Sequence, residues 1–280
     1  MKKLDLIAVP ILVDGDKLIR HFETIDVPLK RYFILDNSMG KDPSVGEAIK
    51  HIINWKPAHI DKVVVCSLPQ NVGFSGAINL IIRQNTDCKH WIVTGFDWWV
   101  KPGEWQKLLK RIDIIPFGAT LATGNDQMCG IVFNPALLKR VGYFDENFFP
   151  GYYEDNDYRY RLKLTNTSLT TIPLAYEHAT SSTLNSSEKF KTKNKVSFQE
   201  NYNYYIKKWG GPPGLELYLT PFNKNYPIDY WAYDPTRSEK FKNGSRVFTK
   251  IFFMAHPEQQ EFIQKVFLYV SRLFYRCICI

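Results

Sequence analysis

The chain has 280 residues, 45% hydrophobic and 15% aromatic, which supplies a core for one large domain and excludes a disordered chain. The formal net charge of +8 favours a polyanionic partner: a nucleotide diphosphate, an acidic lipid or nucleic acid. The odd number of cysteines, five, partly in apolar runs, is typical of reduced thiols. No stretch approaches the roughly 18 apolar residues of a spanning helix, and a signal-peptide core is not apparent. We therefore expect a globular, cytoplasmic protein.

The first half of the chain predicts alternating strands and helices. Short apolar runs alternate with stretches of helical periodicity, a pattern that indicates βαβ units and a parallel sheet. Such sheets bind ligands at the carboxyl ends of their strands, so the polar segments that follow the strands are candidates for the chemistry. Strands are expected at 6–11, 31–35, 62–67 and 90–94, and helices at 17–25, 47–55, 75–85 and 103–112.

The second half predicts a mixed region and then a change of composition. Strands are expected at 119–123, 130–133 and 168–176, with helices at 135–141 and up to residue 164. After residue 181 the chain is rich in Lys, Asn, Tyr and Pro. The Lys-rich run 189–195 fits a solvated helix face. The segment 207–214 indicates a helix end and a loop.

The most concentrated polar feature is the run 151–159 (GYYEDNDYR), at the start of a predicted helix. Glu154, Asp155 and Asp157 place three carboxylates within four positions, and such a cluster persists only where solvent, a cation or a helix N-terminus offsets the repulsion. The cluster therefore fits a base, a metal site or both. Arginines at helical spacing offer partners to these acids.

Three further polar features follow predicted strands. Asn71, Gly73 and Gly76 open a helix, where small residues let the backbone approach a ligand and the helix end favours anions; an ordinary tight turn explains them as well. Asp97 follows a strand, where a carboxylate binds a divalent cation or caps a helix. His178 follows the last predicted strand and fits a ligand or a structural histidine equally.

The order of these segments resembles the family-2-like nucleotide-sugar glycosyltransferases with a GT-A fold. The resemblance covers about residues 4–182 and depends on six segments in the same order. They are 35–38 (LDNS), 71–79 (NVGFSGAIN), Asp97 with Pro102 and Gly103, 141–149 (VGYFDENFF), 154–157 (EDND) with Arg161, and His178 followed by Ser181. It implies an α/β fold with a mixed, Rossmann-like central sheet, flanking helices and a C-terminal helical extension.

The resemblance also implies a donor site for a uridine diphosphate sugar. Asp36 matches the residue that accepts a hydrogen bond from the uracil ring, near the backbone of Pro10. The turn that opens at Asn71 would flank the nucleotide. The other implied donor-binding residues are Asn37, Gly73, Gly76, Asn79, Phe96 and Asp97.

The implied metal and catalytic positions follow from the same match. Asp97 matches the last acid of the family's Asp-x-Asp metal motif, and His178 a further ligand of Mn²⁺ or Mg²⁺. Asp155 matches the catalytic base, and Glu154 a residue that orients it or contacts the acceptor. Gly95 stands where the family has the first acid of the motif. Two alternatives follow: weaker metal binding, or a pyrophosphate balanced partly by Lys or Arg.

Four aromatic residues are predicted to bind the acceptor. Tyr152 and Tyr153 offer an apolar face suited to a sugar ring, although core packing explains them equally well. Trp98 and Trp99 are unusual beside the metal motif; they shape the sugar pocket, or one of them packs inward. We expect an oligosaccharide acceptor.

The expected function is an inverting, UDP-sugar-dependent glycosyltransferase. Length, basic character and the Lys/Asn-rich tail are most similar to small glycosyltransferases of large algal viruses (chloroviruses), which build capsid glycans. That similarity implies transfer of xylose from UDP-xylose onto an N-glycan in the host cytoplasm. Two alternatives remain: a catalytically weakened nucleotide-sugar or glycan-binding module, and a nucleic-acid binder, which the acidic cluster disfavours.

Two regions are predicted along the chain. Residues 1–182 form the nucleotide-sugar-binding and catalytic core, and 183–280 form an extension of the same globule that covers the acceptor side. The apolar-rich run 261–274 predicts a helix docked on the domain, with membrane contact as the alternative. The final CICI (277–280) fits a prenylation signal only loosely.

Overall fold

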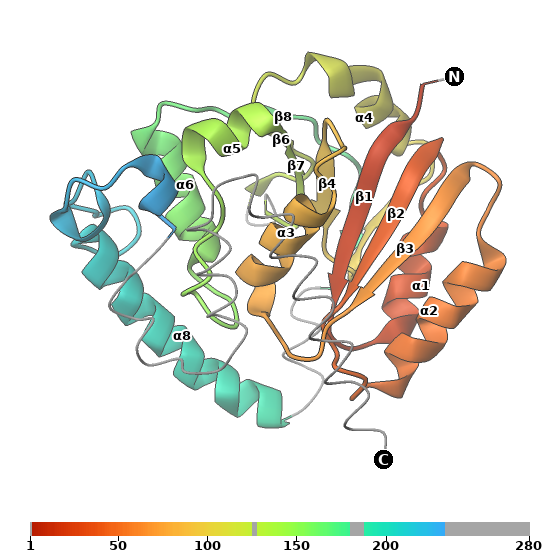
Figure 1. The fold of residues 1–280 in the computed structure, drawn as a ribbon, viewed down its shortest axis with the longest axis horizontal. Helices are drawn as coiled ribbons and strands as arrows, with labels where there is room; N and C mark the ends of the chain where they lie inside the picture. Colours follow the sequence, from red (N-terminus) through yellow and green to blue (C-terminus); the bar gives the residue numbers. More distant parts are fainter. Residues whose placement is uncertain (1, 125–127, 180–187, 233–280) are drawn as a thin grey trace, which may run out of the picture. The chain divides into compact units, whose positions relative to one another are not determined.

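The structure is a computed structural model, shown in Figure 1, that describes residues 2–124, 128–179 and 188–232. Side chains are described for these residues except 188–194. By its contacts the chain divides into two compact units, Met1–Tyr233 and Asp234–Ile280. The first unit contains all the described elements. The helix predicted at 261–274 and the C-terminal cysteines lie outside the described residues.

A seven-stranded mixed sheet forms the centre of the first unit (Figure 1). β1, β2, β3 and β4 run parallel, and β7 joins β4 in the antiparallel direction. This confirms the predicted α/β class with a mostly parallel sheet. The strand order across the sheet is β3 (Ile60–Ser67), β2 (Leu29–Asp36), β1 (Leu4–Ile11), β4 (Trp91–Thr94), β7 (Gly130–Phe133), β6 (Gly118–Thr120) and β8 (Thr170–Thr171).

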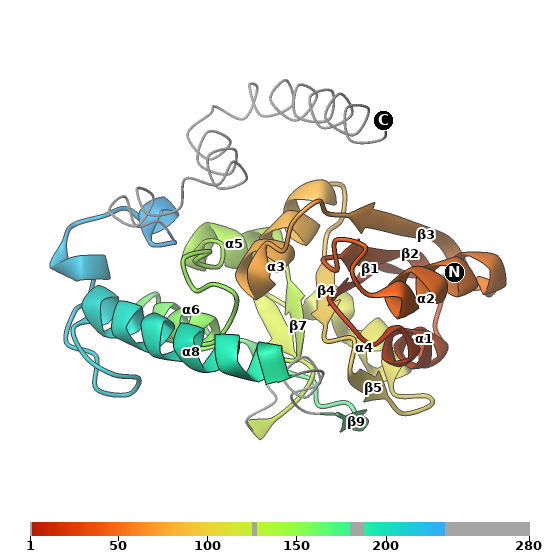
Figure 2. The same cartoon turned by 90° about the horizontal axis from the view of Figure 1, so that it is seen from below.

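Helices cover both faces of the sheet, and the two faces take alternate side chains of β1. Ile7 and Val9 enter one hydrophobic cluster with residues of α1 (Gly15–Glu23), α2 (Pro43–Trp55) and α4 (Trp105–Arg111). Leu6 and Ala8 enter the other with α3 (Gly73–Gln84), α5 (Pro135–Val141) and α6 (Glu154–Leu164). Figure 2 shows α3 and α5 on one side of the strands and α1 and α4 on the other. A strand buried on both faces explains the near-continuous apolar run that predicted it.

A second, two-stranded sheet lies beside the main one. β5 (Trp98–Val100) pairs antiparallel with β9 (Tyr176–His178), with Trp98 opposite His178. The sequence predicted no strand at 98–100 and one continuous strand over 168–176. The structure instead has two short strands there, β8 and β9, which belong to different sheets. Their pairing partners are distant in the sequence, so local periodicity carries no signal for the break.

The helix α8 (Glu188–Trp209) runs along α6 in both views (Figures 1 and 2). Its last turns contribute Tyr204, Tyr205 and Trp209 to a third hydrophobic cluster, which also holds Phe148 and Tyr160. These aromatic side chains therefore pack into a core. Short 3-10 helices follow α4 and α8: η1 (Ile112–Ile114), η3 (Pro221–Asn223) and η4 (Ile228–Tyr230). Across the described ranges, none of the helices has the length and apolarity to cross a membrane.

Candidate functional site

The carboxyl ends of β1, β2 and β3 finish level with one another. Asp36 lies in register with Ile11 on one side and with Ser67 on the other, and Pro10 is opposite Leu35. One carboxylate oxygen of Asp36 accepts a hydrogen bond from the Ser38 backbone N–H at 2.9 Å. The parallel register thus places Asp36 and Pro10 near the carboxyl ends of neighbouring strands, where such sheets bind ligands.

Asn37 and Asn71 connect the turn that follows β2 to the turn that follows β3. The Asn37 side-chain amide donates to Asn71 Oδ1 at 2.9 Å, and Asn37 Oδ1 accepts from the Val72 N–H at 3.0 Å. Asn71 Oδ1 also accepts from the Gly73 N–H at 2.8 Å. Both side chains therefore shape the turn.

The N-terminus of α3 lies directly against the turn that leads into the acidic cluster. The Phe74 N–H donates to the Pro150 carbonyl at 2.8 Å. Gly73 has φ 73°, and a Cβ on it would lie 2.8 Å from Phe149 Cδ2 and 2.9 Å from the Pro150 oxygen. Only a glycine allows this approach, because of both its conformation and its lack of a side chain. At Gly76 a Cβ would lie 3.1 Å from Val72.

Asn79 lies further along α3, away from the turn, and is fully buried. Its side-chain amide donates to the Phe144 carbonyl at 2.9 Å and to Glu146 Oε1 at 2.8 Å, and its Oδ1 accepts from the Phe144 N–H at 3.0 Å. These bonds connect α3 to the segment 144–146, and the contact of Asn79 with the donor stays a prediction. Sequence spacing could not show these bonds, because the partners lie 65 and 67 residues away.

The acidic cluster begins α6. Tyr152 and Tyr153 have φ 75° and φ 68°, a left-handed pair that turns the chain sharply into the helix. Glu154 is buried, and its Oε2 has no hydrogen-bond partner within the described residues. Desolvation, and then repulsion by Asp155, raise the pKa of Glu154 to about 8. Asp155 is half-buried beside it. The first turn thus holds the half-buried Asp155 and the buried Glu154, whose raised pKa favours its protonated form.

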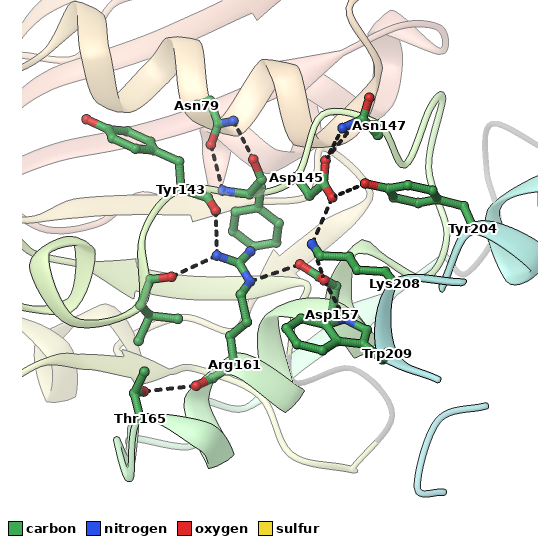
Figure 3. Close-up of polar contacts among 12 residues, drawn as sticks. Asn79, Tyr143, Asp145, Asn147, Asp157, Arg161, Thr165, Tyr204, Lys208 and Trp209 are labelled. Carbon is green, nitrogen blue, oxygen red and sulfur yellow. Dashed lines mark hydrogen bonds and ion pairs between the residues drawn. The ribbon is translucent and has the colours of Figure 1, made fainter. Parts of the chain in front are cut away.

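Asp157 belongs to a buried network that joins α6 to α8 (Figure 3). It accepts from Arg161 Nε at 2.9 Å and from Trp209 Nε1 at 2.8 Å. Lys208 Nζ lies 2.6 Å from Asp157 Oδ1 and 2.8 Å from Asp145 Oδ2, and all three side chains are fully buried. The arginine partner expected for Asp157 is therefore present, and the role of Asp157 is structural.

A second set of contacts from α8 holds the turn before Glu154. The fully buried Asn201 donates its amide to the Gly151 carbonyl at 2.7 Å and also reaches the carbonyls of Phe149 and Tyr152. The ring of Tyr153 packs on Phe198, Tyr202 and Tyr205 of the same helix. Sequence reasoning missed Asn201 and Lys208, since an asparagine or lysine in a polar helix gives no signal that it is buried.

Asp97 and His178 come together at the end of β4, although they are far apart in the sequence. His178 Nε2 lies 3.7 Å from Asp97 Oδ1, because β9 pairs with β5 immediately beyond Asp97. The Asp97 carboxylate, and then a hydrogen bond with Cys129, raise the pKa of His178 to about 10. Over the ranges that the structure describes, Asp97 and His178 have no third His, Cys, Asp or Glu placed to complete a metal-binding group. A cation here would take two protein ligands and complete its shell with ligand oxygens or water.

The aromatic side chains beside Asp97 face inward. Trp98 is fully buried and packs edge-on against Trp105, with ring centroids 6.2 Å apart. Trp99 donates from its indole to the Lys17 carbonyl at 3.1 Å, and the Arg20 guanidinium lies 3.9 Å from its ring centroid. The structure thus favours the alternative of inward packing for Trp98, and the acceptor-binding role of the two tryptophans stays a prediction. Phe96, predicted to bind the donor, is buried in the same cluster.

His21, which sequence reasoning did not select, lies beneath this end of β4. Its Nε2 is 2.8 Å from the Thr94 hydroxyl and its Nδ1 is 3.0 Å from the Tyr32 hydroxyl. Complete burial lowers the pKa of His21 to about 3, against a smaller raising effect of Asp97. The neutral His21 ring therefore connects α1 to β2 and to the last residue of β4.

Comparison with known proteins gives partial similarities. No family model matches the chain. A galactofuranosyl glycosyltransferase of Leishmania donovani is 27% identical over 146 residues, which are 43% of this chain and 33% of that protein. The structure of S. aureus TarS aligns over 89% of this chain and 47% of its own, with 14% identity and a TM-score of 0.49. A structure of TarS 1–349 aligns over 74% of both chains, with 15% identity and a TM-score of 0.45. The chain spans about a third of the first relative and about half of the longer TarS chain.

Proposed function

We propose that the chain is a glycosyltransferase that moves a sugar from a nucleotide diphosphate to a hydroxyl group of a glycan. The observation that carries the proposal is the direct contact between the turn implied for the donor and the turn that carries the acids. The Phe74 N–H donates to the Pro150 carbonyl at 2.8 Å, so the N-terminus of α3 contacts the turn that leads to Asp155. The similarity to part of a glycosyltransferase supports the same conclusion.

In the proposed reaction Asp155 is the base. It removes the proton from an acceptor hydroxyl while that oxygen forms a bond to the anomeric carbon of the sugar. The bond from that carbon to the diphosphate breaks on the opposite face, so the configuration inverts. A diphosphate leaves without taking up a proton, and the reaction therefore needs no second carboxylate as acid, unlike glycoside hydrolysis. Glu154, buried and neutral, would support Asp155 and would not compete with it as a base.

The donor would lie along the carboxyl edge of the sheet. We place the uracil near Asp36 and Pro10, and the diphosphate toward the N-terminus of α3, where backbone N–H groups favour anions. Asp97 would hold Mn²⁺ or Mg²⁺ through a carboxylate oxygen, and His178 through its imidazole once the ring has released the proton that its raised pKa favours. A cation bound there would stabilise the negative charge that develops on the departing diphosphate.

The finer identity of the substrates rests on sequence resemblance. We propose a UDP-sugar as donor, with UDP-xylose as the first to test, and an N-glycan of a viral capsid as acceptor. On the acceptor side, Tyr152 and Tyr153 are half-buried and lie directly before the acids. Their rings also pack against Phe198 of α8, and we propose that they touch an acceptor sugar near Asp155.

The test is Asp155→Asn. Loss of a general base should lower the transfer rate by about 10²–10⁴-fold, while donor binding stays close to that of the wild type. Transfer would be measured with UDP-sugars with and without Mn²⁺, and donor binding by the rise in melting temperature. The exposed Asp229→Asn serves as the matched control and should retain activity. A wild-type rate in Asp155→Asn would contradict the assignment.

The second candidate is a binding module of the same fold that has lost most of its activity. Two observations favour it. Gly95 stands where the family has an acid. In the described residues, Asp97 and His178 are joined by no third His, Cys, Asp or Glu that could hold a metal ion. This candidate predicts that UDP-sugars raise the melting temperature but are neither transferred nor hydrolysed in the presence of Mn²⁺. Turnover with any nucleotide sugar would exclude it.

A further inference from the structure

The turn 149–153 enters α6 through a costly backbone conformation. Tyr152 and Tyr153 are both left-handed, with φ 75° and φ 68°. Residues other than glycine are uncommon in that region, and they persist where the surrounding structure holds them in place. Asp155 lies two residues beyond this pair. Whatever holds the turn therefore also sets the direction in which α6 presents the Asp155 carboxylate.

One side chain of α8 holds the backbone of this turn. The amide nitrogen of Asn201 donates to the Gly151 carbonyl at 2.7 Å. The same nitrogen lies 3.3 and 3.4 Å from the carbonyl oxygens of Phe149 and Tyr152. The carbonyl at position 150 accepts instead from the Phe74 N–H of α3. Each carbonyl group from 149 to 152 therefore has a donor, and three of them share one amide.

Asn201 keeps this position at a cost in free energy. Its side chain is fully buried, yet its Oδ1 has no hydrogen-bond partner within the described residues. A buried polar atom without a partner destabilises the fold, so its presence calls for an explanation. The hydrogen bonds that the amide nitrogen makes to the turn supply that explanation.

The same face of α8 also holds the two tyrosine rings of the turn. The Phe198 ring lies 5.4 Å from that of Tyr152 and 5.0 Å from that of Tyr153, measured between centroids. The Tyr202 ring lies 5.5 Å from that of Tyr153. Phe198 and Tyr202 are three residues before and one residue after Asn201. The aromatic contacts fix the rings, and Asn201 fixes the backbone from which α6 begins.

The docking of α8 on α6 does not depend on Asn201. About two helical turns further along, Lys208 lies between Asp145 and Asp157 with both pairs buried. Trp209 donates to Asp157 at 2.8 Å in the same place. These contacts fasten the end of the helix. The contribution of Asn201 is therefore local to the turn.

We propose that Asn201 is a positioning residue for Asp155. It acts through the turn and not by touching a substrate. The inference rests on the proposed function, in which Asp155 removes a proton from the acceptor hydroxyl. A base must lie within hydrogen-bond reach of its proton, and a displacement of about 1 Å costs up to about 10²-fold in rate. Asn201 lies beyond residues 4–182, so the resemblance to glycosyltransferases does not cover it.

The experiment compares the full-length variants Asn201→Ala and Asn201→Leu with the wild type. Alanine removes the amide, whereas leucine removes the donors and nearly keeps the volume, so an effect that both share comes from the lost hydrogen bonds. Release of UDP from UDP-xylose, and then from other UDP-sugars, would be measured with Mn²⁺ and an oligosaccharide acceptor. We expect kcat to fall about 10–10²-fold in both variants, while the KM for the donor changes by less than about twofold.

A second measurement needs no substrate. Hydrogen exchange of the backbone N–H groups in 149–157 should be faster in both variants, because the turn has lost its donor, while exchange in β1 should not change. The matched control is Asn203→Ala, which removes the amide of an exposed asparagine from the same helix. It should alter neither kcat nor exchange in 149–157.

The outcomes separate this inference from the proposed function. A wild-type kcat in the Asn201 variants would overturn the inference alone. So would a lower melting temperature with an unchanged kcat for the folded protein, since Asn201 would then be only structural. If the wild type released UDP from no UDP-sugar, the proposed function would be overturned, and this inference with it.

Discussion

Glu154 shows how the fold changes the chemistry of a single carboxyl group. Burial raises its pKa from an ordinary 4.5 to about 8, with Asp155 as the second cause. The folded state therefore holds the proton more tightly than the unfolded chain does. The stabilisation from this proton is complete below about pH 4.5 and is lost as the pH rises toward and through 8.

Glu154→Gln should remove this pH dependence, because glutamine mimics the neutral acid and does not ionise. The melting temperature of the wild type should fall more than that of the variant as the pH rises from below 4.5 to above 8. Thermal unfolding across that range measures the difference. Glu23→Gln, at the exposed end of α1, should follow the wild-type curve. Parallel curves for Glu154→Gln and the wild type would refute the assigned pKa.

Gly73 is the second residue at which a small change should have a large effect. In Gly73→Ala the new methyl group meets Phe149 and Pro150 at 2.8 and 2.9 Å, and Pro150 contributes a backbone atom. We expect a loss of about 1–3 kcal/mol in the free energy of unfolding, with a further loss of transfer activity as the two turns separate. Gly103→Ala has the same left-handed φ with no atoms nearby, so it isolates the cost of φ alone. Urea unfolding measures the free energy of unfolding of both variants. Equal losses would contradict the idea that the contacts with Phe149 and Pro150 destabilise Gly73→Ala.

At the scale of elements, α8 is fastened to α6 by a buried charge. Lys208 lies between Asp145 and Asp157, and removing it leaves Asp145 without a cation in the interior, while Asp157 keeps only Arg161. Lys208→Met should therefore cost about 3–5 kcal/mol of stability. Its neighbour Lys207 is exposed, and Lys207→Met should change stability by less than about 0.5 kcal/mol. Urea unfolding of the two variants gives the comparison, and similar effects would mean that the buried network contributes little.

The elements also show where sequence reasoning succeeds and where it stops. β1 and β2 were predictable because buried parallel strands read as apolar runs, and β3, which is largely half-exposed at the end of the sheet, from its apolar run 63–66. The donor role of Asp36 came from the resemblance and stays a prediction. The run 207–214 predicted only a helix end and a loop, since nothing local shows that Lys208 meets acids 63 and 51 residues earlier in the chain. The inward packing of Trp98 was equally hidden, because it depends on Trp105 and on the pairing of β5 with β9.

At the scale of the molecule, the described fold includes α8 as part of the first compact unit. A chain that ends at residue 182 would lose the cation between Asp145 and Asp157 and would expose Phe148 and Tyr160. We expect it not to unfold cooperatively, whereas a chain that ends at residue 233 should. Circular dichroism during heating distinguishes the two. A cooperative transition in the shorter chain would show that residues 1–182 are an autonomous domain.

The pair of Asp97 and His178 has a consequence for how the molecule matures. The two residues are far apart in the sequence and meet only because β9 docks on β5. Contacts of such high sequence separation are costly in loop entropy and tend to form late in folding. A chain that has formed β1 to β4 would already have the carboxyl ends of these strands and Asp97. It would still lack His178 beside Asp97. The candidate cation site is therefore a late product of folding, so binding there would report completion of the fold and not merely its beginning.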